Sequence, residues 1–572
     1  MEPTAPLTDQ GSSKVTTAIV LVAIVIGIAL RAIELGHGRP LWLDEAMLSL
    51  NIASKSFGQL AVPLDYDQSA PLLYLWLERL VVSVAGVSER SMRALPFAAG
   101  VLLVPGTWLV MRRIVGATAA ALSTELVALS VTLISFSAEA KQYGVDPLAT
   151  LMALWFAARV LSSPNNDRRW AQLGVAGVVA LMLSQPAVFV LGGVVLALAV
   201  DAITRHAGHS IRRLVAVAAV WACVFATLYV TVYRATAQSP YMRHFWEGTF
   251  LNPAAPDFLK RVELFTIAAF SAPLLTGAAL GNGAFIGIVW LLGVVWLWRR
   301  SRPMTTLLAG PLILAVAACT IGSYAVMDRL FLFAAPLTLT VLVVPVAAVI
   351  ERARADRRMY ALVATCAAVV AIAGPTLVRR VRQPVFYAVG KQIIADIDSM
   401  SKGDAVYVAA RSFPLWVYYT TDWRAPDVER LQWAASIGGA GAPAHNNAPP
   451  RGSRVQPYEA TRLARSYRGR TEIVGLPTGR QYTTSTRSLD ASIPAAGQAM
   501  PAQPDRGWAQ LEVSRMAAVA RPRLWVFGSH MFALDSAEPE LVGELQRRNV
   551  RLLMERRQGT TVGYQVEFPA EP

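Results

Sequence analysis

The sequence predicts a polytopic α-helical membrane protein with about 11–13 transmembrane helices, followed by a C-terminal soluble α/β domain. Of its 572 residues, 54% are hydrophobic and only 16% are charged, whereas a soluble protein carries about a quarter charged residues. Its mean hydropathy is positive, at +0.42. Long apolar runs recur as far as residue 380, and shorter strand-like segments follow.

Basic clusters between the apolar runs, such as Arg112-Arg113 and Arg168-Arg169, are typical of cytoplasmic loops. Counting crossings from these clusters gives an odd total, with the N-terminus inside and the C-terminus outside. The eleven expected crossings lie near 16–35, 93–111, 116–136, 144–160, 171–185, 186–203, 214–235, 281–298, 305–325, 330–350 and 359–378.

Two further apolar runs do not fit as full crossings. One is Pro71 to Gly86, which carries Glu78-Arg79 in its middle, and the other is 263–279. A Glu-Arg pair in the middle of a bilayer is costly, and either span would move basic clusters to the wrong face. We expect half-inserted or surface-lying helices. If both runs span the membrane, the total becomes thirteen, and the N-terminus remains inside and the C-terminus outside.

The expected domains are a cytoplasmic tail (1–15), a transmembrane domain (16–380) whose first outer loop is about 36–92, and an extracytoplasmic α/β domain (381–572). The tail lacks a signal-peptide cleavage pattern, so the first apolar run should stay as a membrane anchor. Residues 436–510, rich in Gly, Pro, Ser and Arg, predict flexible loops. In the last domain, strands are expected at 404–411, 415–420, 523–530, 551–558 and 561–568, and a helix at 539–549.

The formal net charge of +15 does not indicate a nucleic-acid partner, because most arginines flank apolar runs. The three cysteines, Cys223, Cys319 and Cys366, each lie inside an apolar run and are typical of small buried hydrophobic residues. No Cys/His spacing of the metal-binding kind occurs in the sequence. The partner that composition does predict is the lipid bilayer.

Three polar segments are expected on the outer face. The first contains Asp44 and Glu45, in the sequence LWLDEA. The second is FSAEAKQYGVDP, residues 136–147, and the third is residues 324–329. Charges at a membrane interface are often only solvated or paired at helix ends, but carboxylates in apolar surroundings are candidates for function. Their convergence on one face favours a shared cavity.

Carboxylates and cations in one cavity fit the transfer of a sugar from a lipid phosphate. A carboxylate would accept the proton of the acceptor hydroxyl, and cations or a metal would stabilise the departing phosphate. Residues 239–261, with Tyr241, Phe245 and Trp246 beside Arg243 and His244, indicate either an interfacial aromatic belt or a loop that binds a lipid head or acceptor.

The order of four segments resembles the N-terminal module of the GT-C glycosyltransferases. They are LWLDEA, DYDQSAPLLY, SERSMRALPFAAGVLLVPGTWLVMRRIVG and SFSAEAKQYG. The similarity is greatest to the bacterial branch that includes lipopolysaccharide-core transferases and the aminoarabinose transferases of lipid A, and protein mannosyltransferases are more distant. The resemblance covers about residues 16–200 well, and 200–380 only in layout.

The resemblance implies roles in the first outer loop. Asp44 matches the general base and Glu45, beside it, is a second catalytic candidate in a supporting role, while Asp67 matches a later acidic position. Where the family has His-Pro-Pro-Leu-Tyr, this chain has Ser69-Ala70-Pro71-Leu72-Leu73-Tyr74, so a histidine is missing.

The resemblance also implies donor-binding residues farther along the chain. Glu139 and Tyr143 match the second motif, in which Lys141 replaces an arginine and loses the planar fork that grips phosphate in two places. Arg329 lies where relatives place a cation near the lipid phosphate. A divalent cation, Mg or Mn, is a further expectation, with Asp44 and Glu139 as possible ligands.

The leading hypothesis is an inverting glycosyltransferase of the inner (plasma) membrane. It would use a polyprenyl-phosphate sugar donor and a glycan, lipid or protein acceptor at the outer face. The first alternative is a transporter or flippase of a lipid-linked or charged solute, although the sequence shows no matching halves of the kind that many transporters have. The second is a catalytically degenerate GT-C-like scaffold, which the altered motifs favour.

Overall fold

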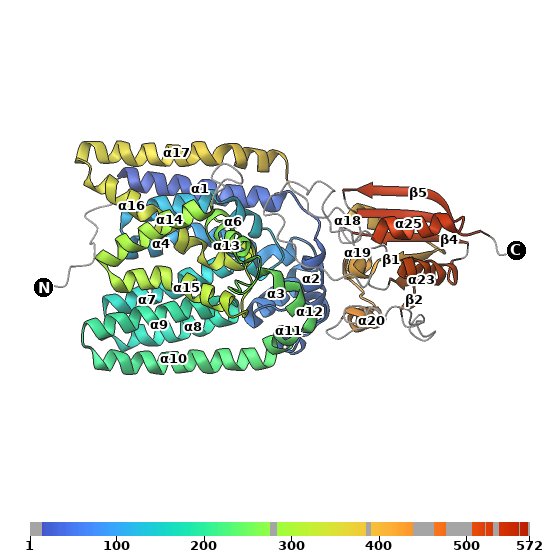
Figure 1. Ribbon diagram of the computed structural model, residues 1–572, viewed down its shortest axis with the longest axis horizontal. Coiled ribbons are helices and arrows are strands. Elements are labelled where there is room, and N and C mark those ends of the chain that lie inside the picture. Colours follow the sequence, from blue (N-terminus) through green and yellow to red (C-terminus); the bar gives the residue numbers. More distant parts are fainter. Residues whose placement is uncertain are drawn as a thin grey trace.

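The structure is a computed structural model that describes residues 14–274, 283–384, 390–438, 463–475, 506–520, 522–529, 537–559 and 561–569. A bundle of long helices forms one part of the molecule and a smaller α/β unit follows at one end (Figure 1). This arrangement confirms the predicted fold class. The expected tail lies almost wholly outside the described residues, as do residues 439–462 and 476–505 of the expected loops.

Nine helices in the described part of the chain are long and apolar enough to cross a membrane. The other two expected crossings coincide with shorter helices, α5 (Ala117–Leu129), which α6 (Val131–Phe136) continues, and α8 (Asp167–Leu183). The nine spans contain α1 (Lys14–Gly36), α4 (Ala94–Ile114), α7 (Asp146–Ser162), α9 (Ala187–Thr204), α10 (Gly208–Leu228), α14 (Gly283–Arg300), α15 (Arg302–Thr320), α16 (Ala335–Arg352) and α17 (Ala355–Arg382).

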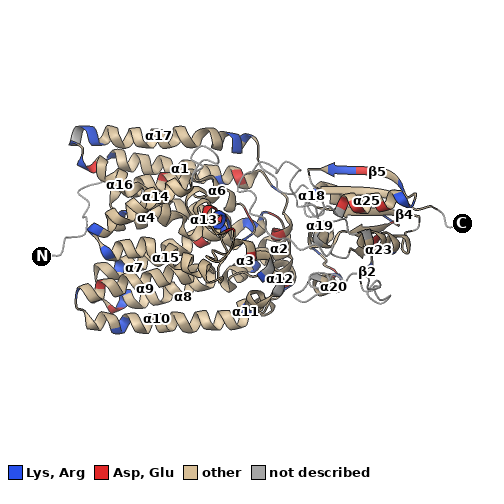
Figure 2. Ribbon diagram, in the orientation of Figure 1, with Lys and Arg blue, Asp and Glu red and all other residues tan. Residues whose placement is uncertain are grey.

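Small residues allow close packing within the bundle, as expected for helices in lipid. At the contact between α9 and α15, a Cβ atom on Gly193 would lie 2.5 Å from Cδ of Pro311. Lys and Arg residues gather at the end of the bundle away from the α/β unit (Figure 2), which agrees with the basic clusters expected in the loops of one face.

Short helices cover the opposite end of the bundle, which we call the site end. They are α2 (Leu43–Ser54), α3 (Leu72–Ala85), α11 (Arg234–Gln238) and α12 (Pro240–Trp246), while α13 (Phe258–Thr266) packs beside α14. The 14 residues of α3 extend only about 21 Å, less than the hydrocarbon core of a bilayer. The second run, 263–279, begins within α13, and its residues 275–279 lie outside the described residues.

Glu78 and Arg79 on α3 form hydrogen bonds with backbone groups at the ends of neighbouring helices. Glu78 Oε1 accepts a hydrogen bond from Leu95 N, at the start of α4, and Arg79 donates to the carbonyls of Ile52 and Ala53, at the end of α2. Helix ends leave backbone groups without partners. These charged side chains therefore fix the positions of α2, α3 and α4.

The α/β unit contains a six-stranded sheet with the order β2-β3-β1-β4-β6-β5. Strand β1 is parallel to β3 and β4, and the other neighbours are antiparallel. The strands are β1 (Ala405–Val408), β2 (Ala464–Tyr467), β3 (Arg470–Val474), β4 (Arg523–Gly528), β5 (Arg551–Gln558) and β6 (Thr561–Glu567), and the helices are α18 (Gly390–Met400), α19 (Phe413–Thr420), α20 (Val428–Gly438), α23 (Arg506–Ala517) and α25 (Ala537–Arg547).

Four of the five expected strands and the expected helix are confirmed, but the strand predicted at 415–420 is wrong. These residues belong to α19, whose first turn contains Pro414. Seven of the eight side chains of α19 are buried, so the run shows no polar face and periodicity could not separate helix from strand. Within the segment predicted as loops, β2 and β3 form a hairpin.

The α/β unit packs directly on α2. Leu41 N donates a hydrogen bond to the Tyr419 hydroxyl oxygen over 2.6 Å, and Lys391 forms an ion pair with Glu89 at 2.5 Å. Leu41 and Ala46 share one apolar core with Trp416 and its neighbours. The segment LWLDEA therefore lies between the helical bundle and the α/β unit.

We expect Tyr419→Phe to lower the thermal stability of the protein in detergent by about 1 kcal/mol or more, because Leu41 N–H loses a buried partner. Tyr418→Phe is the matched control, since the hydroxyl of Tyr418 has no hydrogen-bond partner among the described residues. Thermal unfolding of the two variants measures the difference. Equal melting temperatures would contradict a supporting role for Tyr419.

Candidate active site

The start of α2 separates the two carboxylates of LWLDEA. Trp42 is the N-cap, and its backbone N–H donates to Glu45 Oε2 over 3.1 Å, so Glu45 folds back to cap the helix. Successive residues of a helix point about 100° apart. Asp44 consequently faces a different set of neighbours from Glu45.

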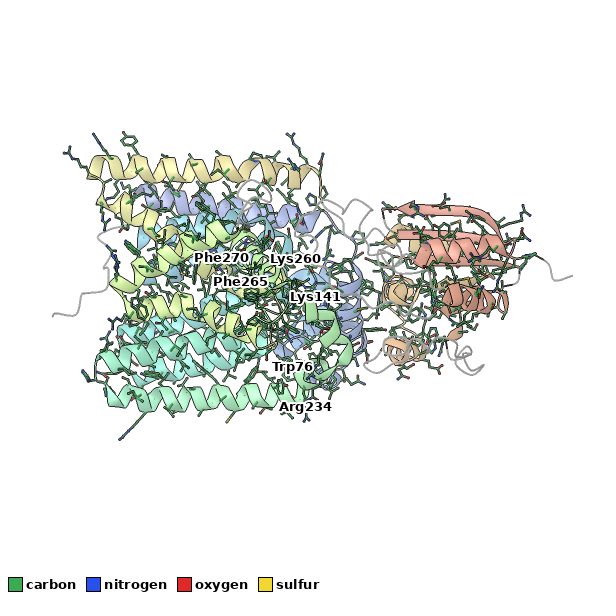
Figure 3. All side chains as sticks on the ribbon, in the orientation of Figure 1. Trp76, Lys141, Arg234, Lys260, Phe265 and Phe270 are labelled. Atoms are coloured by element: carbon green, nitrogen blue, oxygen red, sulfur yellow. The ribbon has the colours of Figure 1, made fainter. Side chains whose placement is uncertain are left out.

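Asp44 lies between two cations that come from distant parts of the chain. Lys141 Nζ is 2.8 Å from Oδ1, and an Arg329 terminal nitrogen is 3.4 Å from Oδ2. Lys141 also donates to Gln68 Oε1 over 2.6 Å. Figure 3 labels Lys141 at the site end of the bundle, on the side of the α/β unit. Three polar segments that the sequence predicts on one face thus meet at Asp44.

The two cations determine the charge of Asp44. Burial alone would raise the pKa of its carboxyl group, but the charges of Lys141 and Arg329 outweigh burial and lower the pKa below its usual value. The side chain is 22% exposed. Asp44 is therefore ionised at neutral pH and retains some access to a second molecule.

Glu45 has both oxygens engaged by protein donors. Arg93 approaches with two nitrogens, at 3.0 and 3.1 Å from Oε1, and Ala140 N donates to the same atom over 2.6 Å. Arg93 and Trp42 N also bind Oε2. The expectation of a direct role beside Asp44 gains no support from this geometry, which favours a positioning role that joins α2 to α4 and to the second polar segment.

Three aromatic rings surround the guanidinium of Arg329. Its central carbon lies 5.5 Å from the ring centre of Tyr143, 5.8 Å from Trp42 and 5.9 Å from Trp246. Arg329 Nε is buried without a hydrogen-bond partner among the described residues. Of the aromatic residues in 239–261, Trp246 thus faces the site, while the side chains of Tyr241 and His244 lie outside the described residues.

Glu139 adjoins the same centre through Trp42, whose indole N–H donates to Oε1 over 3.2 Å. Burial and the negative charge of Glu45 raise the pKa of Glu139 to about 7. The native state therefore holds a proton on Glu139 that an unfolded chain releases near its ordinary pKa of 4.5.

We expect this proton to make stability depend on pH. Between pH 5 and pH 8 the native protein binds more protons than the unfolded chain, so the free energy of unfolding falls as pH rises through this window. Glu139→Gln should remove about 1–3 kcal/mol of that decline. Melting temperatures across the range should converge near pH 5 and favour the variant at pH 8. Parallel curves for the two proteins would contradict the raised pKa.

Asp67 occupies a different environment from Asp44. It is buried, and it follows Tyr66 in a loop where both residues have positive φ, 63° at Tyr66 and 52° at Asp67. Burial raises the pKa of Asp67, which faces the hydroxyl of Ser239. The next residue, Gln68, is the one that reaches Lys141.

Several side chains at the site were not among the residues expected from sequence. They are Trp42, Gln68 and Arg93, together with Arg39, which donates to the carbonyl of Ala138. Arg93 lies within the quoted segment SERSMRALPF, but a single arginine gives no sign of its partner. The pairing spans 48 positions along the chain.

The side chains proposed as metal ligands have other partners in this structure. Both oxygens of Asp44 face cations, and Oε1 of Glu139 accepts a hydrogen bond from the indole N–H of Trp42. Among the described residues, no group of three or more His, Cys, Asp or Glu side chains could hold a metal ion. Lys141 and Arg329 supply positive charge where the expectation had placed a cation.

Known proteins resemble this chain in sequence and in fold. Residues 69–230 match the family described as dolichyl-phosphate-mannose-protein mannosyltransferase. ArnT from Cupriavidus metallidurans bound to undecaprenyl phosphate is 14% identical, with a TM-score of 0.50 over 96% of this chain and 97% of that chain. Its apo state is 13% identical, with a TM-score of 0.51 over 96% and 98% of the two chains.

An oligosaccharyltransferase is also similar. The Archaeoglobus fulgidus enzyme in complex with Zn and sulfate is 14% identical, with a TM-score of 0.50 over 96% of this chain and 72% of that chain. A comparison with curated protein sequences gives no match.

The protein is therefore a multi-pass membrane protein with the fold of the GT-C glycosyltransferases. Within that class, the chain resembles the protein mannosyltransferases in sequence over residues 69–230 and ArnT in fold over nearly its whole length. The resemblance predicted from the four sequence segments is confirmed.

Proposed function

We propose that this protein is an inverting glycosyltransferase that uses a polyprenyl-phosphate sugar at the outer face of the inner membrane. Its acceptor would be an envelope glycan, a lipid or a protein. The observation that carries the proposal is the ionised Asp44 held between Lys141 and Arg329 at one end of a helical bundle. The undecaprenyl phosphate in the similar ArnT structure supports a lipid phosphate as the donor.

The reaction assigns one task to each charged group. Asp44 accepts the proton of the acceptor hydroxyl while the acceptor oxygen forms a bond to the anomeric carbon of the sugar. The bond from that carbon to the phosphate oxygen breaks, and the electron pair leaves with the lipid phosphate. Lys141 and Arg329 stabilise the charge that develops on this phosphate.

The resting contacts are compatible with this sequence of events. Without a donor, the two cations neutralise Asp44, and an incoming phosphate competes for both of them. Lys141 would contact the phosphate through one nitrogen, whereas the arginine of a relative would contact it through two. The short distance from Lys141 to Asp44 keeps a cation at the centre, which supports an active enzyme over a degenerate scaffold.

The test is transfer by the purified protein in lipid nanodiscs. Lipid-linked sugars extracted from a deletion strain serve as the donor pool, and envelope glycans from the same strain serve as acceptors. We expect one glycan to change and free polyprenyl phosphate to appear in equal amount. Movement of the lipid across vesicles without any change of glycan would instead support the transporter.

A further inference from the structure

Four polar side chains near Asp44 have buried atoms that lack a hydrogen bond of ordinary geometry among the described residues. The atoms are Asp146 Oδ1, Gln142 Oε1, and the hydroxyl oxygens of Ser184 and Tyr233. Asp146, Gln142 and Ser184 are at most 3% exposed. Native proteins rarely leave such groups unpaired, because each costs free energy when it is removed from water without a partner.

These side chains come from four elements that converge at the site end. Asp146 begins α7, Gln142 precedes it, Ser184 is the C-cap of α8, and Tyr233 belongs to the short π-helix Tyr229–Tyr233 that follows α10. The Ser184 hydroxyl faces the Asp146 carboxyl group, which is also within electrostatic range of the Tyr233 hydroxyl. We call these four residues the polar pocket.

The polar pocket adjoins the centre at Asp44 through the first outer loop. Gln142 Nε2 donates to the carbonyl of Ser69 over 3.3 Å, and Gln185 Nε2 donates to the hydroxyl of Ser69 over 2.8 Å. The preceding residue, Gln68, accepts a hydrogen bond from Lys141. A ligand that reaches Lys141 therefore lies close to the polar pocket.

The chemistry of the pocket selects among the parts of a lipid-linked donor. A carboxyl group, an amide oxygen and two hydroxyl groups bind hydroxyl or amine groups, and none of them carries a positive charge. A prenyl chain would leave all four unpaired, and the phosphate finds its cations at Lys141 and Arg329. The part that remains is the sugar.

We infer that Asp146, Gln142, Ser184 and Tyr233 form a subsite that binds the hydroxyl or amino groups of the donor sugar. The inference rests on the proposed function and adds the residues that recognise the sugar. Because the Tyr233 hydroxyl has no hydrogen-bond partner among the described residues, its removal costs no internal hydrogen bond, whereas the Ser184 hydroxyl interacts with the Asp146 carboxyl group. A purely structural role therefore predicts a different result from a binding role.

Binding of defined lipids to the purified protein in nanodiscs tests the subsite. The probes are undecaprenyl phosphate, undecaprenyl-phosphate glucose and undecaprenyl-phosphate 4-amino-4-deoxyarabinose. We expect Ser184→Ala and Tyr233→Phe each to weaken binding of the preferred sugar lipid about tenfold, with the melting temperature of Tyr233→Phe unchanged or higher. Binding of undecaprenyl phosphate alone should not change. Tyr229→Phe is the matched control, because Tyr229 lies on the same turn with its side chain exposed.

Each other outcome has a separate meaning. If the wild-type protein binds neither sugar lipid more tightly than undecaprenyl phosphate, or if the variants bind all lipids as the wild type does, the sugar subsite is overturned and the pocket holds water. A loss that is equal for the bare and the sugar-bearing lipids also overturns it. If the wild-type protein binds no polyprenyl phosphate at all, the proposed function itself fails.

Discussion

Asp44→Asn is expected to reduce sugar transfer by about 10²–10⁴-fold, because an amide cannot accept the proton of the acceptor hydroxyl. Asparagine has nearly the same shape and keeps an oxygen that Lys141 can bind. We therefore expect the variant to insert and fold in the membrane. Steady-state transfer from the lipid-linked donor measures the loss, and thermal unfolding in detergent checks the fold.

Asp65→Asn is the matched control for this variant. Asp65 lies in the same outer loop and pairs with Lys55 at 3.0 Å, and both side chains are partly exposed. A pair of this kind contributes at most about 1 kcal/mol, so activity should remain near that of the wild type. Full activity of Asp44→Asn would refute the assignment of the base. The same activity loss in both variants would indicate that the loop, and not the carboxylate of Asp44, is required.

The sequence predicts the membrane part of the fold because lipid imposes a simple rule on composition. Each of the eleven expected crossings coincides with a helix, and the run with Glu78-Arg79 is correctly separated from them. No such rule applies to the segment 415–420, which was predicted as a strand but forms part of α19. Its side chains are buried by both α2 and the sheet, and contacts that distant in sequence leave no periodic signal.

The candidate site is predictable as a meeting of segments but not as a set of contacts. Loops on one face of a bundle must share a small area, so the convergence of Asp44, Lys141 and Arg329 follows from topology. The direction of each side chain does not follow. The cap that turns Glu45 away from Asp44 depends on Trp42 N and Arg93, and the polar pocket depends on atoms whose lack of partners only coordinates reveal.

Breaking the buried pair of Glu45 and Arg93 is expected to destabilise the protein by about 3–5 kcal/mol, because either single change leaves an unpaired charge in a dry environment. Both side chains are only 3% exposed. Arg93→Met should lower the melting temperature and also reduce transfer, since α2 then loses the contact that fixes Asp44. Glu89→Gln is the control: its partner Lys391 is 52% exposed, and loss of such a pair costs at most about 1 kcal/mol.

The double variant Glu45→Leu, Arg93→Met separates positioning from direct chemistry at Glu45. If Glu45 only holds α2 in place, two apolar side chains of similar volume can restore much of the lost stability, and the effects of the single changes will not add. Transfer should then recover together with the melting temperature. If Glu45 takes part in the reaction, the stability of the double variant will recover while its transfer activity does not. The melting temperature and the transfer rate are measured on the wild type, Glu45→Leu, Arg93→Met and the double variant. Together they distinguish a residue that positions Asp44 from one that shares its chemistry.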